Sequence, residues 1–191
     1  MHISEDSPVL NEKKSLIVVR YAKPADMPKA RELVRKTWLH TYPNEAFGIS
    51  REDIAHHLDP SHPENASRVQ SDSLVNTQQD YFVLVAYHRK KKKLVGFCRG
   101  SREHAEIRSL YVLPAYQRLG VGSALLADAI RLIGIENHVS LQVVRYNYDA
   151  ITFYERFGFR VVRALPSSAT RPLRGSNKKL PQVLMRREGK R

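Results

Sequence analysis

Cysteine is the scarcest reactive residue in this sequence. A chain of 191 residues with one cysteine, Cys98, can form no intramolecular disulfide and no zinc site built from several cysteines. Cys98 lies in the apolar run LVGFC, which predicts a small buried core residue. Long hydrophobic runs are missing too, so no stretch is predicted to cross a membrane. Because the first residues lack the charged start and apolar run of a secretory signal, we expect a cytoplasmic protein.

Acidic residues are also in short supply. The sequence has 19 Asp and Glu residues and 32 Lys and Arg residues, which gives a net charge of +13 and a pI near 10.0. Such a charge attracts polyanions, whether nucleic acid, an acidic protein or a phosphorylated cofactor, but says nothing about fold. Much of the excess lies in the run RKKKK at 89–93 and in the tail from Arg160. We expect the RKKKK run to be a solvated hairpin turn.

Length and hydrophobic periodicity predict one mixed α/β domain. The composition, 42% hydrophobic and 27% charged, is that of a globular protein, and the length favours a single domain. We predict a disordered lead at 1–14 and one domain over 15–191. Alternating or apolar runs predict strands at 16–22, 81–87, 93–100, 106–113, 139–145, 159–165 and 180–187. Helical spacing predicts helices from Pro24 to Trp38, from Ser50, where Asp53 completes a capping box, at 64–77, at 121–133 and within 147–159. The sum is a mixed, mostly antiparallel sheet flanked by helices.

The stretch QRLGVG joins a predicted strand to a predicted helix. A helix N-terminus offers unpaired N–H groups and the positive end of a dipole, a combination that binds phosphate. Gly120 and Gly122 let the backbone come close to a ligand, and Arg118 adds positive charge. No Lys follows Gly122, which argues against a mononucleotide P-loop, and Leu125 stands where a dinucleotide fingerprint needs its third glycine. The residues favour a pyrophosphate cradle, although a plain glycine-rich turn stays open.

Two segments carry a resemblance to a known family. QRLGVG is similar to the acyl-CoA-binding signature of the GCN5-related N-acetyltransferase (GNAT) superfamily, Q/R-x-x-G-x-G/A, which lies between a strand and a long helix. NYDAITFYERFGF, which begins 27 residues beyond Gly120, resembles the second signature of that superfamily. The resemblance covers roughly 16–187 and is strongest over 106–159. It implies a single-domain GNAT-like fold with a strand-helix-strand acyl-CoA-binding unit, acetyl-CoA as co-substrate and no metal.

The resemblance also implies roles for individual residues. Backbone groups at the end of the strand are expected to face the acetyl and pantetheine arm, with the N–H of Val112 as donor to the carbonyl oxygen. Asn147 is expected to contact the pantetheine, and Tyr154 to lie near the sulfur as general acid, although packing beside Phe153 and Phe157 would also explain this tyrosine. The expected acyl-CoA-binding residues are Leu110, Tyr111, Val112, Gln117, Arg118, Leu119, Gly120, Val121, Gly122, Ser123 and Asn147.

The general base is the least defined part of the pattern. In the branch of the superfamily that acetylates protein N-termini, a Glu often lies five residues before the Asn, but here that position is Gln142, which cannot accept a proton. In the histone-acetylating branch, a Glu eleven residues before the Gln is the base, and that position is Glu106. Strand alternation predicts one face that carries Glu106, Arg108, Leu110 and Val112. A surface ion pair of Glu106 with Arg108 and a water chain without a dedicated base remain alternatives.

Histidines and aromatic residues cluster before residue 65. His40, His56, His57 and His62 lack the spacing of a zinc motif, so no metal site is predicted. The aromatic residues Trp38, Tyr42 and Phe47 are expected to pack against a helix or to line the acceptor cleft. The resemblance to the GNAT superfamily, in which the corresponding helix-loop segment helps to shape the acceptor site, implies substrate selection by the segment TYPNEAFG.

These patterns predict an N-acetyltransferase that passes the acetyl group from acetyl-CoA directly to a primary amine. The acceptor is open, either a small amine, or a lysine or N-terminus of a protein, and a cationic polyamine is disfavoured by the positive charge. Two alternatives remain: a nucleic-acid or ribosome-associated basic binding protein on the same fold, and a non-catalytic acyl-CoA-binding regulator. No membrane association is expected, and both a monomer and a homodimer stay open.

Overall fold

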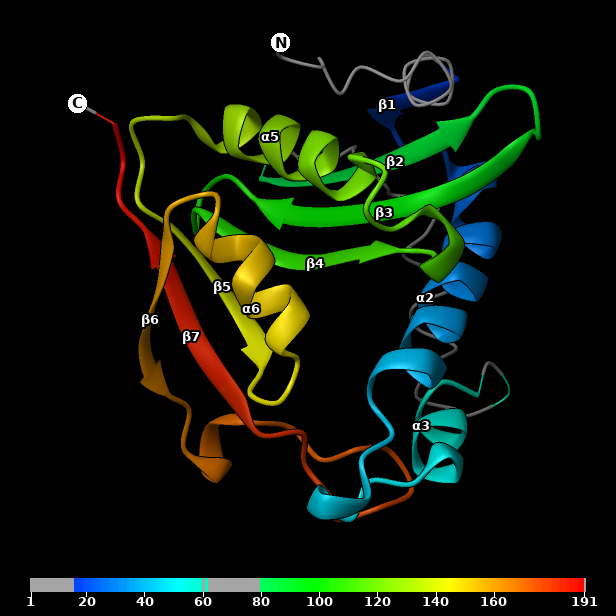
Figure 1. Cartoon of the computed structure of the whole chain (residues 1–191), viewed down its shortest axis with the longest axis vertical. Helices are drawn as coiled ribbons and strands as arrows, with labels where there is room; N and C mark the ends of the chain where they lie inside the picture. The colour runs from blue at the N-terminus through cyan, green and yellow to red at the C-terminus, as the bar shows by residue number, and fades with distance from the viewer. Residues whose placement is uncertain (1–15, 60, 62–79, 191) are drawn as a thin grey trace, which may run out of the picture.

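The computed structural model describes residues 16–59, 61 and 80–190, and its centre is a seven-stranded sheet (Figure 1). The strand order is β1-β2-β3-β4-β5-β7-β6, and only the β4–β5 pair is parallel. The strands are β1 (Ile17–Tyr21), β2 (Tyr81–His88), β3 (Lys93–Ser101), β4 (Glu106–Val112), β5 (Val139–Val144), β6 (Phe159–Ala164) and β7 (Gln182–Arg187). The α-helices are α2 (Met27–Thr41), α3 (Arg51–His57), α5 (Val121–Ile133) and α6 (Tyr148–Glu155). The short 3-10 helices are η1 (Pro24–Asp26), η2 (Glu45–Phe47), η4 (Pro114–Tyr116) and η5 (Ser167–Ala169).

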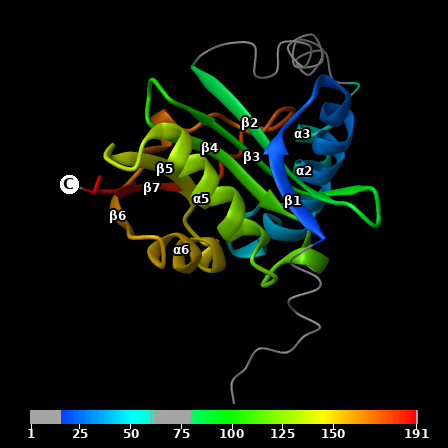
Figure 2. The ribbon, with the colours of Figure 1, turned by 90° about the horizontal axis from the view of Figure 1, so that it is seen from above.

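Helices cover both faces of the first half of the sheet. Figure 2 shows β2, β3 and β4 between α5 on one side and α2 on the other, and Figure 1 shows α6 on the same side as α5. The helix α5 approaches the sheet closely at Gly96, where an added Cβ would lie 2.7 Å from Leu125 Cδ1. Leu125, Leu126 and Cys98 are fully buried, so the prediction of a core cysteine is confirmed. Burial raises the pKa of the Cys98 thiol to about 12, so it carries no charge at neutral pH.

Most predicted elements are confirmed, with small shifts at their ends. Pro24 opens η1 rather than α2, which begins three residues later. The capping box is present, since Asp53 N donates to Ser50 Oγ at 3.1 Å and Ser50 N donates to Asp53 Oδ2 at 2.7 Å. The run RKKKK forms the exposed turn between β2 and β3, as predicted. The predicted lead at 1–14 and helix at 64–77 lie outside the described residues.

The sheet opens between its two halves. The parallel strands β4 and β5 pair only at Glu106 with Ser140 and at Ile107 with Leu141. Beyond these residues the strands separate, and Figure 1 shows β5, β7 and β6 turning away from β4. The second half of β4 therefore has a partner, β3, on one edge only. This open edge is the feature around which the candidate site is built.

A second hydrophobic cluster joins the two halves at the other end of the opening. The long connection between β6 and β7, residues 165–181, packs against α3 and the end of α2, and we call it the strap. Leu173 and Leu180 of the strap are buried with Ile49 and Ile54. Arg174 N donates to His57 Nδ1 at 2.9 Å, and Lys178 Nζ lies 2.7 Å from Asp53 Oδ2. None of the described helices is long and apolar enough to span a membrane.

Candidate active site

The open edge of β4 presents two backbone N–H groups. Leu113 N donates to Val95 O at 3.0 Å, so the N–H of Leu113 faces β3. Because successive N–H groups of a strand point to opposite edges, those of Val112 and Leu110 face the opening toward β5. The Val112 carbonyl points the same way and accepts a hydrogen bond from Gln117 Nε2 at 3.2 Å. Backbone donors are thus available at the edge where an acyl carbonyl was expected.

Tyr111 lies differently from this expectation. Its backbone pairs with Phe97 of β3, and its side chain points to the α2 face, where the ring centroid is 6.4 Å from that of Trp38. The residue therefore takes part in the site through its phenol ring rather than through backbone groups at the open edge.

The loop after β4 leads directly into an uncapped helix. Arg118 and Gly120 both have left-handed backbone conformations, with φ of 59° and 79°. Gly120 is the N-cap of α5 and has no side chain to cap it, so the first intrahelical bond runs from Ala124 N to Gly120 O at 3.0 Å. The N–H groups of residues 121–123 precede this bond and have no intrahelical acceptor. With the helix dipole, these groups form an anion site of the kind that holds a pyrophosphate.

Gly122 of α5 lies beside Phe153 of α6. An added Cβ on Gly122 would be in ordinary van der Waals contact, 3.4 Å from Phe153 Cζ and 3.7 Å from Val112 Cγ2, so a branched or longer side chain would press on Phe153. Arg118 Nη2 lies 2.9 Å from Asp149 Oδ1, and both side chains are largely exposed. This small residue, the donors of the α5 N-terminus and the open edge of β4 fit a phosphate-bearing acyl thioester.

Asn147 and Tyr154 mark the two ends of α6. Asn147 is the N-cap of α6, and its Oδ1 accepts a hydrogen bond from Ala150 N at 3.2 Å, so its amide NH2 group is the part that can bind a ligand. Tyr154 is 7% exposed and lies near Cys98 of β3 and Tyr111 of β4. Burial, followed by the proximity of Cys98 and Tyr111, raises the pKa of Tyr154 well above its usual value near 10. The phenol therefore keeps its proton at neutral pH. It can donate a hydrogen bond to a ligand but does not act as a base.

The prediction that Glu106 shares a face with Leu110 and Val112 is wrong. Arg99 pairs with Ser109 and Gly100 with Ile107, so β4 contains a bulge at Arg108. The extra residue reverses the alternation, which puts Ile107 on the face of Leu110 and Glu106 on the α2 face. Glu106 Oε2 lies 3.0 Å from Arg108 Nε, the ion pair that was the alternative to a role as base.

Aromatic side chains from both halves of the chain meet on the α2 side of the opening. Trp38 and Tyr42 lie at the end of α2 with ring centroids 4.8 Å apart, and Trp38 stacks on His57 at 5.3 Å. Phe47 stacks on Tyr146 at 4.8 Å, and Tyr146 OH donates to Tyr42 O at 2.8 Å. The Tyr42 and Tyr111 hydroxyls are hydrogen-bonded to each other. We call Trp38, Tyr42, Phe47, His57, Tyr111 and Tyr146 the aromatic wall.

The sequence left Trp38, Tyr42 and Phe47 either to pack against a helix or to line an acceptor cleft, and it did not indicate their partners. Tyr146 is the second residue after β5, close to where a side chain at the opening would be expected, and this position is the signal that could have identified it. Nothing local in the sequence identifies the bulge at Arg108 or the contact between Gly122 and Phe153. Both depend on how separate elements pack.

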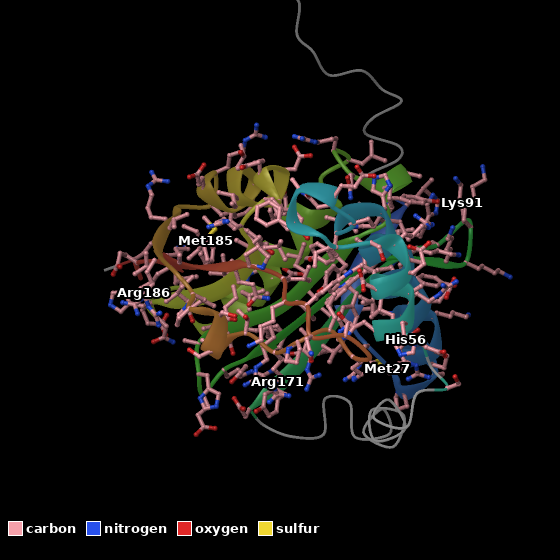
Figure 3. All side chains as sticks on the ribbon, turned by 90° about the horizontal axis from the view of Figure 1, so that it is seen from below. Met27, His56, Lys91, Arg171, Met185 and Arg186 are labelled. Atoms are coloured by element: carbon pink, nitrogen blue, oxygen red, sulfur yellow. The ribbon has the colours of Figure 1, made fainter. Side chains whose placement is uncertain are left out.

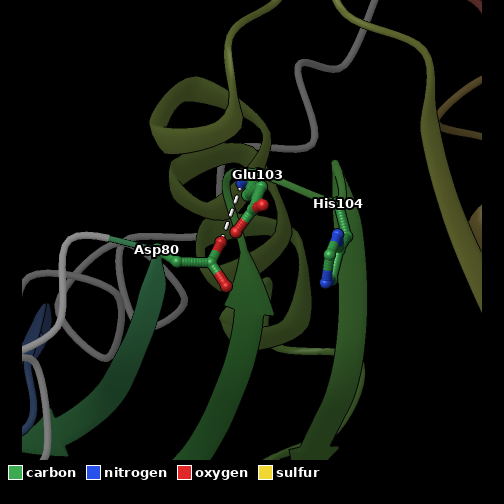
Figure 4. Close-up of side chains that lie close together, drawn as sticks. All are labelled: Asp80, Glu103 and His104. Atoms are coloured by element: carbon green, nitrogen blue, oxygen red, sulfur yellow. Dashed lines mark hydrogen bonds between the residues drawn. The ribbon is translucent and has the colours of Figure 1, made fainter.

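A group of possible metal ligands lies away from the open edge. Asp80, Glu103 and His104 bring their ligand atoms within 4.8 Å of one another (Figure 4). The Asp80 Oδ1 atom already accepts hydrogen bonds from Ser101 Oγ at 2.6 Å and Glu103 N at 2.8 Å, so this carboxylate caps the β3–β4 turn. An open hollow of about 410 Å³ lies nearby, lined by His104, His138, Ser140, Arg186 and Glu188. Neither feature involves the α5 N-terminus or the aromatic wall.

Comparisons with solved structures show the same fold in other acetyltransferases. The PaiA N-acetyltransferase of Thermoplasma acidophilum, solved with coenzyme A, has a TM-score of 0.67 and 22% identity, over 90% of this chain and 98% of that one. A GCN5-related N-acetyltransferase of Rhodopseudomonas palustris has a TM-score of 0.64 and 19% identity, over 90% and 94% of the two chains. A phosphinothricin acetyltransferase of Sinorhizobium meliloti, solved with acetyl-CoA, has a TM-score of 0.62 and 17% identity, over 91% and 89%.

At the level of sequence, no curated protein matches the chain significantly. Residues 31–159 match the profile of the acetyltransferase (GNAT) family, and this segment contains the open edge of β4, the loop, α5 and α6. The protein therefore belongs to the GNAT family of acetyltransferases.

Proposed function

We propose that this protein binds acetyl-CoA and transfers its acetyl group directly to a primary amine. The observation that carries the proposal is the continuity of three features: the open edge of β4, the uncapped N-terminus of α5 and the proton-bearing Tyr154. The first suits an acyl carbonyl, the second a pyrophosphate and the third a departing thiolate. The N–H groups of residues 118–123 hold the phosphates in this proposal, and the amide NH2 of Asn147 binds the pantetheine.

The backbone supplies the stabilisation of negative charge. As the amine adds to the thioester, the carbonyl oxygen gains charge, and a fixed N–H donor at that point lowers the barrier. The N–H of Val112 is our candidate, and the N–H of Leu110 faces the same opening. Because both belong to a strand held by β3, they are already oriented before the reaction begins.

Tyr154 stabilises the departing sulfur. A thiol has a pKa of about 8.5, which lies far below the raised pKa of this phenol, so complete proton transfer to a free thiolate is unfavourable. A hydrogen bond from the Tyr154 hydroxyl to the sulfur, strengthened as charge develops, gives the same selectivity for the transition state without forming a phenolate.

In this proposal Glu106 keeps its ion pair with Arg108 through Oε2, and its Oε1 accepts the amine proton through water rather than by contact. It lies at the closed end of the opening, beside Ser140, whereas Leu110 lies four positions further along β4, about 13 Å at about 3.3 Å per residue. That separation is too long for direct transfer. Glu106 faces the α2 side, the side of the aromatic wall, and in this proposal the amine approaches from that side.

Calorimetric titration with acetyl-CoA at physiological salt tests the cradle. An acidic residue in the first turn of α5 stabilises the helix but repels phosphate, so Ser123→Asp is expected to fold normally and to weaken binding at least about 30-fold. Ser123→Asn has a similar shape without the charge and is the matched control, expected within about threefold of the wild type. A folded wild-type protein that binds no acetyl-CoA would overturn the proposal.

The alternatives receive less support. Figure 3 shows basic side chains far apart around the molecule, with Lys91, Arg171 and Arg186 in three separate places, whereas nucleic-acid binding favours a continuous basic track. A non-catalytic regulator would bind acetyl-CoA without acetylating any amine, and Tyr154→Phe would not affect it. Mass-spectrometric detection of an acetylated amine separates this case from the enzyme.

A further inference from the structure

The chemistry of the acceptor can be inferred from the aromatic wall, on the assumption that the proposed function holds. Loop 118–123, α5 and α6 lie on one side of the sheet and take the acyl-CoA. The amine must then reach the open edge of β4 from the other side, where α2, η2 and the strap lie. The surface it meets there is the aromatic wall, whose outermost ring is Phe47, 39% exposed and stacked on Tyr146.

Two polar groups at or beside the wall, the Arg145 guanidinium and the Trp38 indole, are donors without a partner among the described residues. Arg145 lies with its guanidinium carbon 5.4 Å from the centre of the Phe47 ring, and within the described residues no carboxylate pairs with it. The indole Nε1 of Trp38 is buried and has no hydrogen-bond acceptor among the residues that the structure describes. Buried donors without acceptors are uncommon in folded proteins, and a ligand oxygen is one way to supply the acceptor.

Two carboxylates near the wall have cationic partners: Asp53 of α3 pairs with Lys178, and Glu106 pairs with Arg108. Glu45 of η2 is exposed, and among the described residues no ion pair joins it to Arg145. A ligand at this surface therefore meets flat apolar rings and an unpaired guanidinium, against a net charge of +13. Aromatic rings favour a flat apolar body, and the guanidinium favours an anion that can bind in a bidentate manner.

We propose that the acceptor is a primary amine on an aromatic body whose outer end carries a carboxylate, and that Phe47 and Arg145 select it. The amine points to the open edge of β4, the ring lies against Phe47 and Tyr146, and the carboxylate pairs with Arg145 at the rim. Phe47 and Arg145 act in this scheme as specificity-determining residues.

Three amines that differ only at the end of the ring opposite the amine test the charge. They are 4-(2-aminoethyl)benzoate, which is anionic there, 2-phenylethylamine, which is neutral, and 4-(2-aminoethyl)-N,N,N-trimethylanilinium, which is cationic there and has no second amine that can be acetylated. We expect kcat/KM to fall in that order, by about fivefold at each step, as a partly exposed ion pair allows. Arg145→Gln is expected to abolish the advantage of the benzoate while leaving 2-phenylethylamine within about twofold. Arg163→Gln, which removes an exposed arginine of β6, is the matched control and is expected to leave the order unchanged.

The aromatic body is tested with 2-phenylethylamine and hexylamine. Phe47→Leu keeps an apolar side chain but removes the ring, and we expect the ratio of kcat/KM for these two amines to fall about fivefold. Equal rates for the three ring amines, or a preference for the cationic one, would overturn the proposal. Saturable acetyl-CoA binding with acetylation of aliphatic amines only would overturn it too, while the proposed function would stand. A wild-type protein that binds no acetyl-CoA would overturn both the proposed function and this inference about the acceptor.

Discussion

The two sides of the opening between β4 and β5 are built from different kinds of group. On the α5 side, the donors are backbone N–H groups of β4 and of the α5 N-terminus, and Gly120 takes a left-handed backbone conformation there. On the α2 side, the surface consists of side chains, and the rings come from α2, η2, α3, β4 and the second residue after β5. Backbone donors suit the part of a ligand that many enzymes have in common, because they do not depend on the side chains. Side chains suit the part that differs, because they can vary without changing the fold. The acyl-CoA side is therefore general and the acceptor side specific.

Enlarging Gly122 gives the largest expected effect on acetyl-CoA binding. In Gly122→Val the added Cβ would be in ordinary contact with Phe153 Cζ at 3.4 Å and Val112 Cγ2 at 3.7 Å, and the two methyl groups beyond it would press against these side chains and push Phe153 of α6 away from α5. We expect acetyl-CoA binding to weaken by at least about 100-fold, because the first turn of α5 can no longer approach the phosphates. Ala124→Val, an exposed position of the same turn, places the same side chain away from the contact and controls for helix propensity. Equal affinity of the two variants would contradict the role of Gly122.

Removing the Tyr154 hydroxyl should reduce turnover without reducing binding. For Tyr154→Phe we expect kcat to fall about 10²- to 10³-fold, the range for loss of one hydrogen-bond donor to a developing negative charge, with the Kd of acetyl-CoA within about twofold. Tyr148→Phe in the same helix, at a position 73% exposed, is the matched control. Steady-state assays with a saturating amine measure kcat, and calorimetric titration measures the Kd of acetyl-CoA. A fall in binding equal to the fall in kcat would mean that the tyrosine is a packing residue only.

A variant of Tyr146 tests whether the acceptor side can be changed without changing the acyl-CoA side. Tyr146→Phe removes the hydroxyl that donates to Tyr42 O at 2.8 Å and loosens the aromatic wall. We expect the KM of the amine to rise about three- to tenfold, a loss of about 1 kcal/mol of free energy of unfolding, and no change in acetyl-CoA affinity. Thermal unfolding and steady-state kinetics provide the measurements. A parallel loss of acetyl-CoA affinity would show that the two sides are not independent, because the wall would then support the acyl-CoA side as well.

The same contrast explains which features the sequence made predictable. The loop with Gln117, Arg118, Gly120 and Gly122 depends on local backbone conformation, so its residues lie together in the chain and can be recognised as a pattern. Strand positions were also predictable because β2 and β3 are long apolar runs. The face of Glu106 was not, since the bulge at Arg108 reverses the alternation.

The acceptor side resisted prediction for another reason. Its contacts join residues far apart in the chain, such as Tyr42 with Tyr146 and His57 with Arg174. No local period or motif encodes such pairs, because each side chain is compatible with ordinary core packing on its own. Trp38, Tyr42 and Phe47 were placed near an acceptor cleft only because the helix and loop that carry them correspond to that region in the family.

The smallest expected effect concerns the strap that supports the acceptor side. Asp53 has its pKa lowered from 3.8 to about 2, chiefly by the hydrogen bond from Lys178 and then by that from Ser50. Because the folded protein holds this carboxylate ionised more strongly than the unfolded chain does, the contribution to stability is complete above about pH 4 and is lost as the pH falls toward 2. Lys178→Met keeps the aliphatic length but removes the charge, and with a side chain 47% exposed the pair is worth little, so we expect a Tm lower by about 2 °C at pH 7. The difference between variant and wild type should shrink as the pH is lowered from 4 to 2.5 in a calorimetric series, while Lys190→Met, at an exposed position near the end of the chain, gives the baseline. A difference that stays constant with pH would show that Lys178 stabilises the strap by packing, and the strap would then be held to α3 by its buried leucines alone.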